Sequence, residues 1–283
     1  FLLMKAIILN LSAWVILPFM DTIAKYLSAE LSFFQITWAR YFFTVVWTLP
    51  FIFFFFRKNL TWSQNPKLQI LRGLTLFSAN ICFFYSISII SMAKALTLAF
   101  VAPLVTTALS PIFLEERVGV KRWIAVVIGF IGSLVVIRPV IIEFNLATVA
   151  ALGTGCFYGV YLIITRKLHS TDNPLLTLLI TGIVGATVSS LLVPIVWVNP
   201  TNMQWLWLSI MGIFACLGHI LLIYSLKYAN ASKLAPLGYF EIITNIILGY
   251  FFFKDFPDIW TFLGLAIIIS SGFYIFRNEL NLR

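Results

Sequence analysis

The sequence contains few charged residues. Asp, Glu, Lys and Arg together make up 10% of its 283 residues, whereas a soluble domain carries about 25%. It contains only 3 cysteines and 2 histidines, and the cysteines show no spacing typical of metal ligands or of a disulfide framework. No glycine loop that could cradle a phosphate and no nucleophile motif is found. These absences argue against a metal site, a cofactor, an ATP-driven pump and an enzyme.

Apolar residues take the place of charge: 61% of the chain is hydrophobic, and the mean hydropathy is +1.01. The apolar runs are continuous rather than alternating, which favours transmembrane helices over a β-barrel. About 20 helical residues cross a hydrocarbon core of about 30 Å. The sequence thus predicts an all-α polytopic membrane protein with 10 spans, the first a retained helix rather than a signal peptide. The expected spans are residues 4–27, 32–56, 68–90, 93–114, 123–137, 146–165, 175–198, 204–226, 232–253 and 259–276.

The net charge of +9 is explained by topology. If the amino terminus is cytoplasmic, 14 of the 19 Lys and Arg residues fall on the cytoplasmic side and 4 on the other, with Arg40 inside the second span. This bias follows the positive-inside rule and predicts that both termini are cytoplasmic. The basic excess is therefore not a nucleic-acid footprint.

The chain resembles itself when it is shifted by 139 residues. Residues 1–139 and 140–283 then form two repeats of five spans each. Because five is odd, the second repeat enters the membrane from the opposite side, which makes an inverted repeat. Secondary transporters with this architecture bind substrate near the midplane, between the halves. The matched positions include Tyr85 with Tyr224, Lys94 with Lys233, and Arg138 with Arg277.

One carboxylate lies deep within the ninth predicted span. Gly238, Glu241, Asn245 and Gly249 follow one another at helical spacing and share one face. An ionised carboxylate in hydrocarbon needs a partner, water or a proton. We favour a helix that lines an aqueous pathway, with Glu241 at the substrate or proton site. The alternative is a Glu that joins two helices by hydrogen bonds.

The first predicted span also has a polar face, formed by Asn10, Trp14, Pro18, Asp21 and Lys25. The two charged residues are four apart, so they are expected to pair. The proline frees a backbone carbonyl and can kink the helix. The span is expected to act as a hinged gate or site, with Asp21 in a functional role. An outer-interface pair with a snorkelling Lys25 is the alternative.

Two basic side chains in the spans admit two interpretations each. Arg40 could bind an anionic substrate group, or it could reach Asp21 or backbone carbonyls, and the structural interpretation is slightly favoured. His219 could carry protons or donate to Glu241. A lone intramembrane histidine is more often a helix–helix hydrogen bonder, which we favour here.

Aromatic and small residues complete the pattern. Tyr158 and Tyr161 share one face of the sixth predicted span and suit a pocket, although Tyr161 could instead belong to an interfacial belt. Asn80 is a weaker candidate of the same kind. Small residues predict close helix packing in the fifth, seventh and tenth spans. They are Gly129, Ser133, Gly182, Ala186, Ser271 and Gly272.

Several motifs together resemble the drug/metabolite transporter superfamily, in its EamA-type ten-span branch, over essentially the whole chain. The ninth and tenth spans and the segment 21–27 are similar to a subgroup that includes S-adenosylmethionine uptake carriers. Gly218-His219 resembles a feature of related carriers, including some riboflavin importers. The motifs are Glu115-Glu116-Arg117, Arg122-Trp123, Gly129-Phe130-Ile131-Gly132, Ala235-Pro236, Tyr239, Glu241 and Gly249-Tyr250.

The resemblance implies a multi-pass protein of the bacterial inner membrane that carries a small metabolite by alternating access. The substrate would be cationic or zwitterionic, such as S-adenosylmethionine, an amino acid or a related compound, with proton or counter-substrate coupling. Riboflavin-type transport, a membrane-embedded enzyme and a channel are the alternatives. Acids would bind the cation and aromatic rings would stack on it. The cavity residues selected are Trp14, Asp21, Asn80, Tyr158, His219, Tyr239, Glu241 and Asn245.

Overall fold

The computed structural model describes residues 2–55, 63–113, 119–137, 145–168, 172–228, 237–238 and 240–280. All regular elements in these ranges are helices, which confirms the predicted all-α class. In chain order they are α1 (Leu2–Leu27), α2 (Phe33–Phe55), α3 (Pro66–Ile89), α4 (Met92–Ala99), α5 (Ala102–Phe113), α6 (Val120–Ile137), α7 (Leu146–Leu168), α8 (Pro174–Leu192), the 3₁₀ turn η2 (Val193–Val196), α9 (Asn202–Tyr228), α11 (Phe240–Phe253) and α12 (Ile259–Leu280).

The helices have the length and apolar surface that a bilayer requires. Seven helical segments of the described residues are long and apolar enough to cross a membrane, and the shorter apolar ones lie in α6, α11 and α12. Large apolar side chains cover their outer faces; Phe54 and Ile195, for example, are 76% and 82% exposed. In water such a surface would drive aggregation. The chain is therefore a multi-pass membrane protein.

Helix starts follow local sequence signals. Pro66 and Pro174 occupy the first turns of α3 and α8, where a missing N–H leaves no hydrogen bond unmade. The Asn173 side chain accepts from the Leu175 N–H at 2.9 Å, and the Ser91 side chain caps α4. These caps satisfy amide groups that have no partner inside the helix.

The fourth span, predicted as continuous over residues 93–114, is interrupted in the structure. The helix α4 ends at Ala99 and α5 begins at Ala102. At the junction the Val101 N–H donates to the Leu98 carbonyl at 3.2 Å, as in a tight turn. Pro103 has no N–H to donate to the Ala99 carbonyl, so the α-helical ladder cannot continue there.

A comparable discontinuity precedes α11. The ninth span was predicted to run continuously over residues 232–253. Residues 232–236 and Tyr239 lie outside the described residues, while Leu237 and Gly238 lie in a 3₁₀ turn and α11 begins at Phe240. The shift of 139 residues carries the break at 99–102 onto 238–241. Transporters with inverted repeats often have such broken helices at matched positions, next to the substrate.

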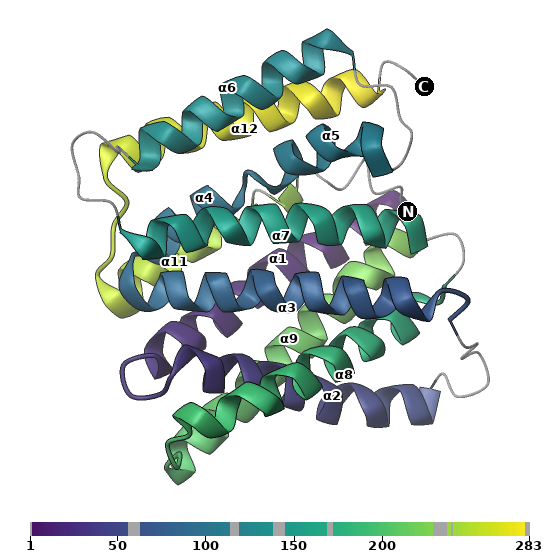
Figure 1. Ribbon diagram of the computed structural model, residues 1–283, viewed down its shortest axis with the longest axis vertical. Coiled ribbons are helices and arrows are strands. Elements are labelled where there is room, and N and C mark those ends of the chain that lie inside the picture. The colour runs from purple at the N-terminus through teal and green to yellow at the C-terminus, as the bar shows by residue number, and fades with distance from the viewer. Residues whose placement is uncertain are drawn as a thin grey trace.

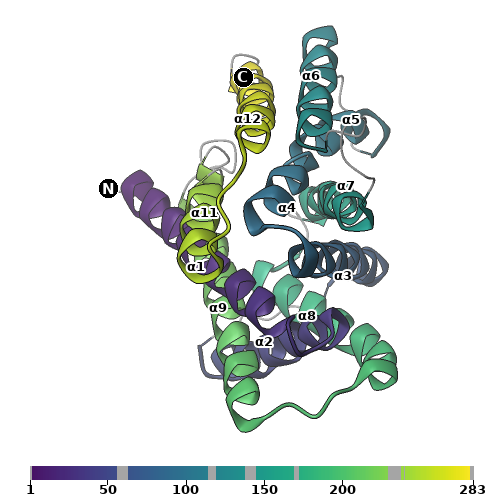
Figure 2. The ribbon, with the colours of Figure 1, turned by 90° about the vertical axis from the view of Figure 1, so that its left-hand side faces the viewer.

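The packing of the helices is also matched between the halves (Figures 1 and 2). The most extensive contacts join α1 to α9, α3 to α7, and α6 to α12. Under the proposed repeat α1 corresponds to α7 and α9 to α3, so the first two contacts are equivalent. Figure 2 shows α6 and α12 together at one end of the molecule and α2, α8 and α9 at the other, with α1, α3, α4, α7 and α11 between them.

Small residues let α6 and α12 approach closely, as predicted. A Cβ on Gly264 would lie 2.7 Å from the Gly132 carbonyl oxygen. The Ser271 hydroxyl donates to the Ala125 carbonyl on the facing helix. Close backbone approach of this kind gives helices in lipid the packing that hydrophobic attraction cannot supply.

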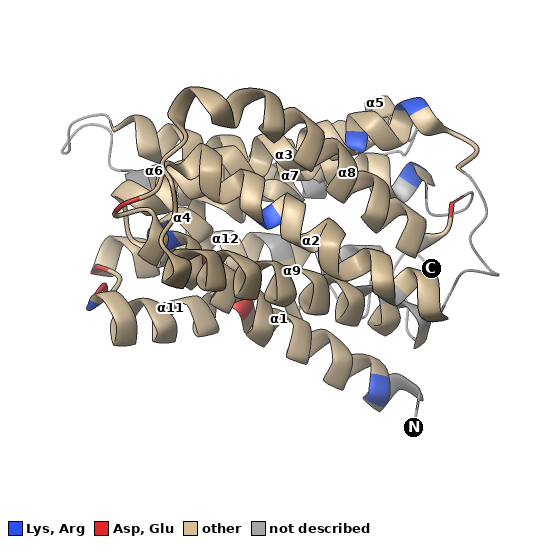
Figure 3. Ribbon diagram, turned by 90° about the horizontal axis from the view of Figure 1, so that it is seen from below, with Lys and Arg blue, Asp and Glu red and all other residues tan. Residues whose placement is uncertain are grey.

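Charged side chains concentrate at the two ends of the helices (Figure 3). The N-terminal end of α1 and the C-terminal end of α12 lie at the same end of the bundle (Figure 1). The cytoplasmic location of that end remains a prediction. Among the residues whose side chains are described, Asp21, Arg40 and Arg72 are the buried charged ones, with exposures of 3%, 4% and 7%.

Candidate functional site

Asp21 is a buried acid on α1 without a hydrogen-bond donor among the described residues. The nearby Thr22 hydroxyl donates to the Pro18 carbonyl at 2.8 Å, one turn earlier, and not to the carboxylate. Arg40 on α2 acts on the Asp21 charge electrostatically but forms no ion pair with it. The acid is thus held in a low-dielectric setting without direct compensation from the part of the chain that the structure describes.

Glu241 is the second interior acid and lies in the first turn of α11. The positive end of a helix favours a negative charge there. The side chain is half-buried, and the charge of Asp21 reaches it. Tyr158 on α7 is also within electrostatic reach of Glu241. Residues from α1, α7 and α11 therefore converge around two carboxylates.

Asn245 lies one turn below Glu241 on α11. Its Nδ2 donates to the Glu241 carbonyl at 3.1 Å. The side chain is fully buried, and its Oδ1 accepts no hydrogen bond from a described residue. A buried acceptor without a donor is rare and costs about 1–3 kcal/mol.

Arg40 and His219 form a second polar centre, between α2 and α9. The Arg40 Nη2 lies 3.3 Å from His219 Nε2 and its Nε lies 3.3 Å from Met20 Sδ. Since an arginine can only donate, His219 Nε2 must be the acceptor. The guanidinium also stands 4.7 Å from the centre of the Tyr41 ring. None of these partners carries a negative charge.

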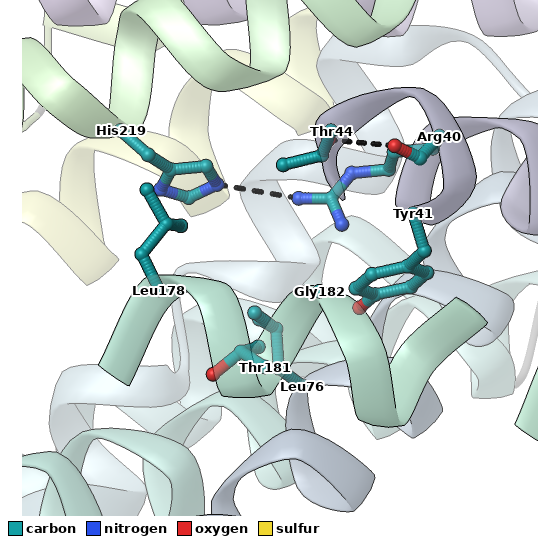
Figure 4. A pocket seen from close by; sticks show the side chains of 8 residues that line it. All are labelled: Arg40, Tyr41, Thr44, Leu76, Leu178, Thr181, Gly182 and His219. Atoms are coloured by element: carbon teal, nitrogen blue, oxygen red, sulfur yellow. Dashed lines mark hydrogen bonds between the residues drawn. The ribbon is translucent and has the colours of Figure 1, made fainter. Parts of the chain in front are cut away.

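A narrow pocket opens beside this centre (Figure 4). The sticks in Figure 4 show the guanidinium between the imidazole and the Tyr41 ring, over the surface of α8. The lining residues are Arg40, Tyr41, Thr44, Leu76, Leu178, Thr181, Gly182 and His219.

Arg72 on α3 is the other buried arginine among the described residues, and each of its three nitrogens donates to an oxygen. Its Nε donates to Thr165 Oγ1 at 2.7 Å and its Nη2 to the Tyr161 hydroxyl at 2.6 Å. Its Nη1 donates to the Thr177 carbonyl at 3.2 Å and to Thr181 Oγ1 at 2.5 Å. The network joins α3, α7 and α8, which gives Arg72 a structural role.

The remaining predicted residues have varied surroundings. Trp14 donates to Asn10 Oδ1 at 2.8 Å, and its ring lies 3.6 Å from where a Cβ on Gly238 would be. Asn80 donates to the Tyr41 hydroxyl at 2.6 Å. Tyr239 lies outside the described residues.

The rings of Tyr158 and Tyr161 stack, with centroids 5.2 Å apart. Tyr161 is 9% exposed and accepts a hydrogen bond from Arg72. It therefore belongs to the interior, and the interfacial-belt interpretation is wrong.

The predicted ion pair between Lys25 and Asp21 was wrong. Its ammonium pairs with Asp255, in the connection between α11 and α12, and not with Asp21. It also donates to the Ile90 carbonyl at 3.2 Å. A partner 230 residues away gives no local signal, whereas a spacing of four suggests an intrahelical pair.

The contacts of the two buried arginines, Arg40 and Arg72, also differ from those expected from the sequence. Arg72 lies within the third predicted span and was counted only as a charge on the cytoplasmic side, yet it is buried in α3. Arg40 was expected to reach backbone carbonyls or Asp21, yet it contacts His219 and Met20. His219 is the helix–helix hydrogen bonder that we favoured, and no bond joins it to Glu241. The position of both arginines within apolar stretches was the available signal.

Comparison with known proteins identifies the family. The profile of the EamA-like transporter family matches the chain twice, over residues 4–138 and 145–277. The chain belongs to the EamA-like transporter family. A protein of known crystal structure shares the fold of this EamA-like transporter, with a TM-score of 0.68 over 98% of both chains at 15% sequence identity.

Curated relatives of this EamA-like transporter carry small molecules. It is 30% identical to an S-adenosylmethionine uptake transporter of Rickettsia bellii, over 92% of this chain and 89% of that one. It is also 30% identical to a riboflavin transporter of Vibrio cholerae, over 66% of this chain and 63% of that one. The family and these relatives point to a transporter rather than an enzyme, in the bacterial inner membrane.

Proposed function

We propose that this EamA-like transporter is a secondary active carrier of S-adenosylmethionine or a related amino-acid derivative, working by alternating access. The similarity to the Rickettsia bellii carrier, which extends over 92% of the chain, supports this substrate class. Asp21 and Glu241 support it chemically, because S-adenosylmethionine carries a sulfonium and an ammonium group.

The single observation that carries the proposal is a pair of interior acids whose carboxylates accept no hydrogen bond from the residues that the structure describes. Asp21 and Glu241 interact electrostatically across α1 and α11, and like charges in a low dielectric repel. A bound cation would relieve this repulsion, and so would a proton. Trp14 and Tyr158 supply aromatic faces for a sulfonium or ammonium group. Glu241 therefore serves as the cation receptor or as the coupling site.

Alternating access is supported by the symmetry of the chain. The family profile matches each half, the contacts α1–α9 and α3–α7 are equivalent under the repeat, and the break at 99–102 has a counterpart before Phe240. We infer that residues 1–139 and 140–283 are inverted repeats that rock about a midplane site.

Riboflavin is the second candidate, because a riboflavin transporter is among the relatives. Its isoalloxazine ring could stack on aromatic residues but carries no positive charge. With a neutral ring as substrate, the two interior acids would serve proton coupling alone and would not bind the substrate through its charge. Competition of unlabelled riboflavin against labelled S-adenosylmethionine separates the two candidates.

The test is uptake of labelled S-adenosylmethionine into proteoliposomes, with and without a pH gradient. We expect the wild type to show saturable uptake and Glu241→Gln to lower it at least about tenfold, since a charged partner contributes about 1.5–3 kcal/mol. Glu30→Gln is the matched control, because Glu30 is an exposed carboxylate that accepts from Gln204.

The outcome for Glu241→Gln decides the role of this acid. Undiminished uptake by a normally expressed variant removes it from the mechanism. Mass spectrometry of the internalised compound separates a carrier, which delivers it unchanged, from an enzyme. Uptake that does not saturate would indicate a channel.

A further inference from the structure

Arg40 differs from the other buried arginine in what satisfies it. Both side chains are almost completely buried, at 4% and 7% exposure. Arg72 has a neutral oxygen acceptor for each of its three nitrogens. The described partners of Arg40 are the weak sulfur acceptor of Met20 at Nε, the imidazole of His219 at Nη2 and the Tyr41 hydroxyl, and none of them is an anion.

A buried guanidinium without an anionic partner costs free energy unless a ligand or water binds it. No carboxylate in the described part of the chain lies within ion-pair distance of Arg40. Arg40 lies inside the membrane-spanning region, where charged residues commonly mark substrate pathways. The arrangement is therefore that of a receptor for an anionic group, because a carboxylate would replace weak or neutral partners with charge-assisted hydrogen bonds.

In this conformation Arg40 borders a void of about 10 Å³, which is the size of one water molecule, so a substrate group could reach the guanidinium only after the void widens. The guanidinium lines the pocket shown in Figure 4. His219 Nε2 accepts from Nη2 and Tyr41 packs against its face, so the guanidinium plane is fixed on two sides. These contacts orient Arg40 without neutralising it.

The two interior acids, Asp21 and Glu241, carry the charge opposite to that of Arg40. Arg40 acts electrostatically on Asp21, and Asp21 acts on Glu241. Acid and guanidinium are near enough to interact but too far apart to pair. A zwitterion can bridge such a gap, with its cationic group toward the acids and its anionic group toward the arginine.

We propose that Arg40, oriented by His219, binds the carboxylate of a zwitterionic amino-acid substrate. The inference rests on the proposed function and sharpens it, because it assigns the recognised group. Arg40 then selects compounds that carry an α-carboxylate over otherwise identical amines.

The test compares inhibition of labelled S-adenosylmethionine uptake by S-adenosylmethionine and by its decarboxylated analogue. In the wild type the analogue should inhibit at least about tenfold more weakly, since it cannot form the charged hydrogen bonds. Arg40→Gln should bring the ratio of the two inhibition constants to about one, because neither compound gains from a glutamine as from a guanidinium. Arg72→Gln, the matched control, should keep the wild-type ratio even if it lowers expression.

The ratio of the two inhibition constants is informative even for a variant with weakened uptake. Arg40→Lys keeps the charge, so it should retain part of the preference for the compound with the carboxylate. Wild-type discrimination in Arg40→Gln would overturn the proposal. If the wild type took up no S-adenosylmethionine, the proposed function would fail instead.

In that case the unfolding temperature of the purified protein without ligand decides the role of Arg40. Arg40→Met should leave the temperature unchanged or raise it, because it removes an uncompensated buried charge, whereas Arg72→Met should lower it. A decrease with Arg40→Met as large as with Arg72→Met would make Arg40 structural and overturn the proposal.

Discussion

Individual buried charges in this transporter are of two kinds. Arg72 donates to an oxygen from each of its three nitrogens and joins three helices. Asp21, Glu241 and Arg40 have incomplete partners among the described residues. Removing the partner of a buried ion costs more than the pair contributes, so incomplete groups are expected only where a ligand, a proton or water completes them.

Asn245 provides a test at this scale. Asn245→Leu removes a buried Oδ1 that has no donor among the described residues, and it also removes the Nδ2 hydrogen bond to the Glu241 carbonyl. These two effects oppose each other, so the unfolding temperature in detergent should change little. Uptake should fall, since we expect this acceptor to face the substrate beside Glu241.

Asn80→Leu is the matched control. It breaks bonds to the Tyr41 hydroxyl and the Leu76 carbonyl and should lower the unfolding temperature, by an amount corresponding to about 1–3 kcal/mol. A decrease as large with Asn245→Leu would assign Asn245 to the scaffold.

Helical phase was sufficient to select the interior acids, but not their partners. Asp21 and Glu241 were recognised because a carboxylate in an apolar stretch is conspicuous. The contacts of Lys25 with Asp255 and of Arg40 with His219 join residues 230 and 179 positions apart. Such pairs depend on how the helices pack, which periodicity within one helix does not encode.

At the scale of helices, hydropathy located the spans well but missed their breaks. Apolar length is a strong signal because the bilayer requires it. The interruption between Ala99 and Ala102 depends on a few backbone angles, and Pro103 was its only local signal. The start of α11 at Phe240 places Glu241 at a helix N-terminus rather than in mid-helix, which changes how its charge is stabilised.

The Lys25–Asp255 ion pair ties the end of α1 to the connection after α11. The side chains are 14% and 34% exposed, so we expect Lys25→Asp or Asp255→Lys alone to lower stability by about 1 kcal/mol, mainly through like-charge repulsion. The double charge reversal should recover most of that loss, measured as the unfolding temperature in detergent. If the double variant were no more stable than either single one, the pair would have no energetic role.

The α6–α12 contact depends on its small residues. Gly264→Ala would force a Cβ to within 2.7 Å of the Gly132 carbonyl oxygen, and a backbone atom cannot move aside cheaply. We expect a loss of about 1–3 kcal/mol, seen as a lower unfolding temperature. Gly119→Ala is the control, because a Cβ there meets nothing within 4 Å. Equal effects of the two substitutions would show that close approach is unimportant.

At the scale of the whole molecule, two similar halves pack in equivalent ways. The repeat was visible in the sequence because charged and aromatic residues recur at span ends after 139 residues. The site was only partly predictable. Its two acids lie on α1 and α11, and more than two hundred residues separate the end of α1 from the start of α11. The sequence does not directly encode the distance between these two acids in space. The predicted cytoplasmic side of the termini depends on charge bias alone.

The most direct measurement is equilibrium binding of labelled S-adenosylmethionine to the purified transporter, comparing wild type with the double variant Asp21→Asn, Glu241→Gln. We predict saturable binding by the wild type and by Glu30→Gln, and none by the double variant at the same concentrations. Binding by the double variant with an unchanged dissociation constant would contradict the claim that these two interior acids hold the substrate.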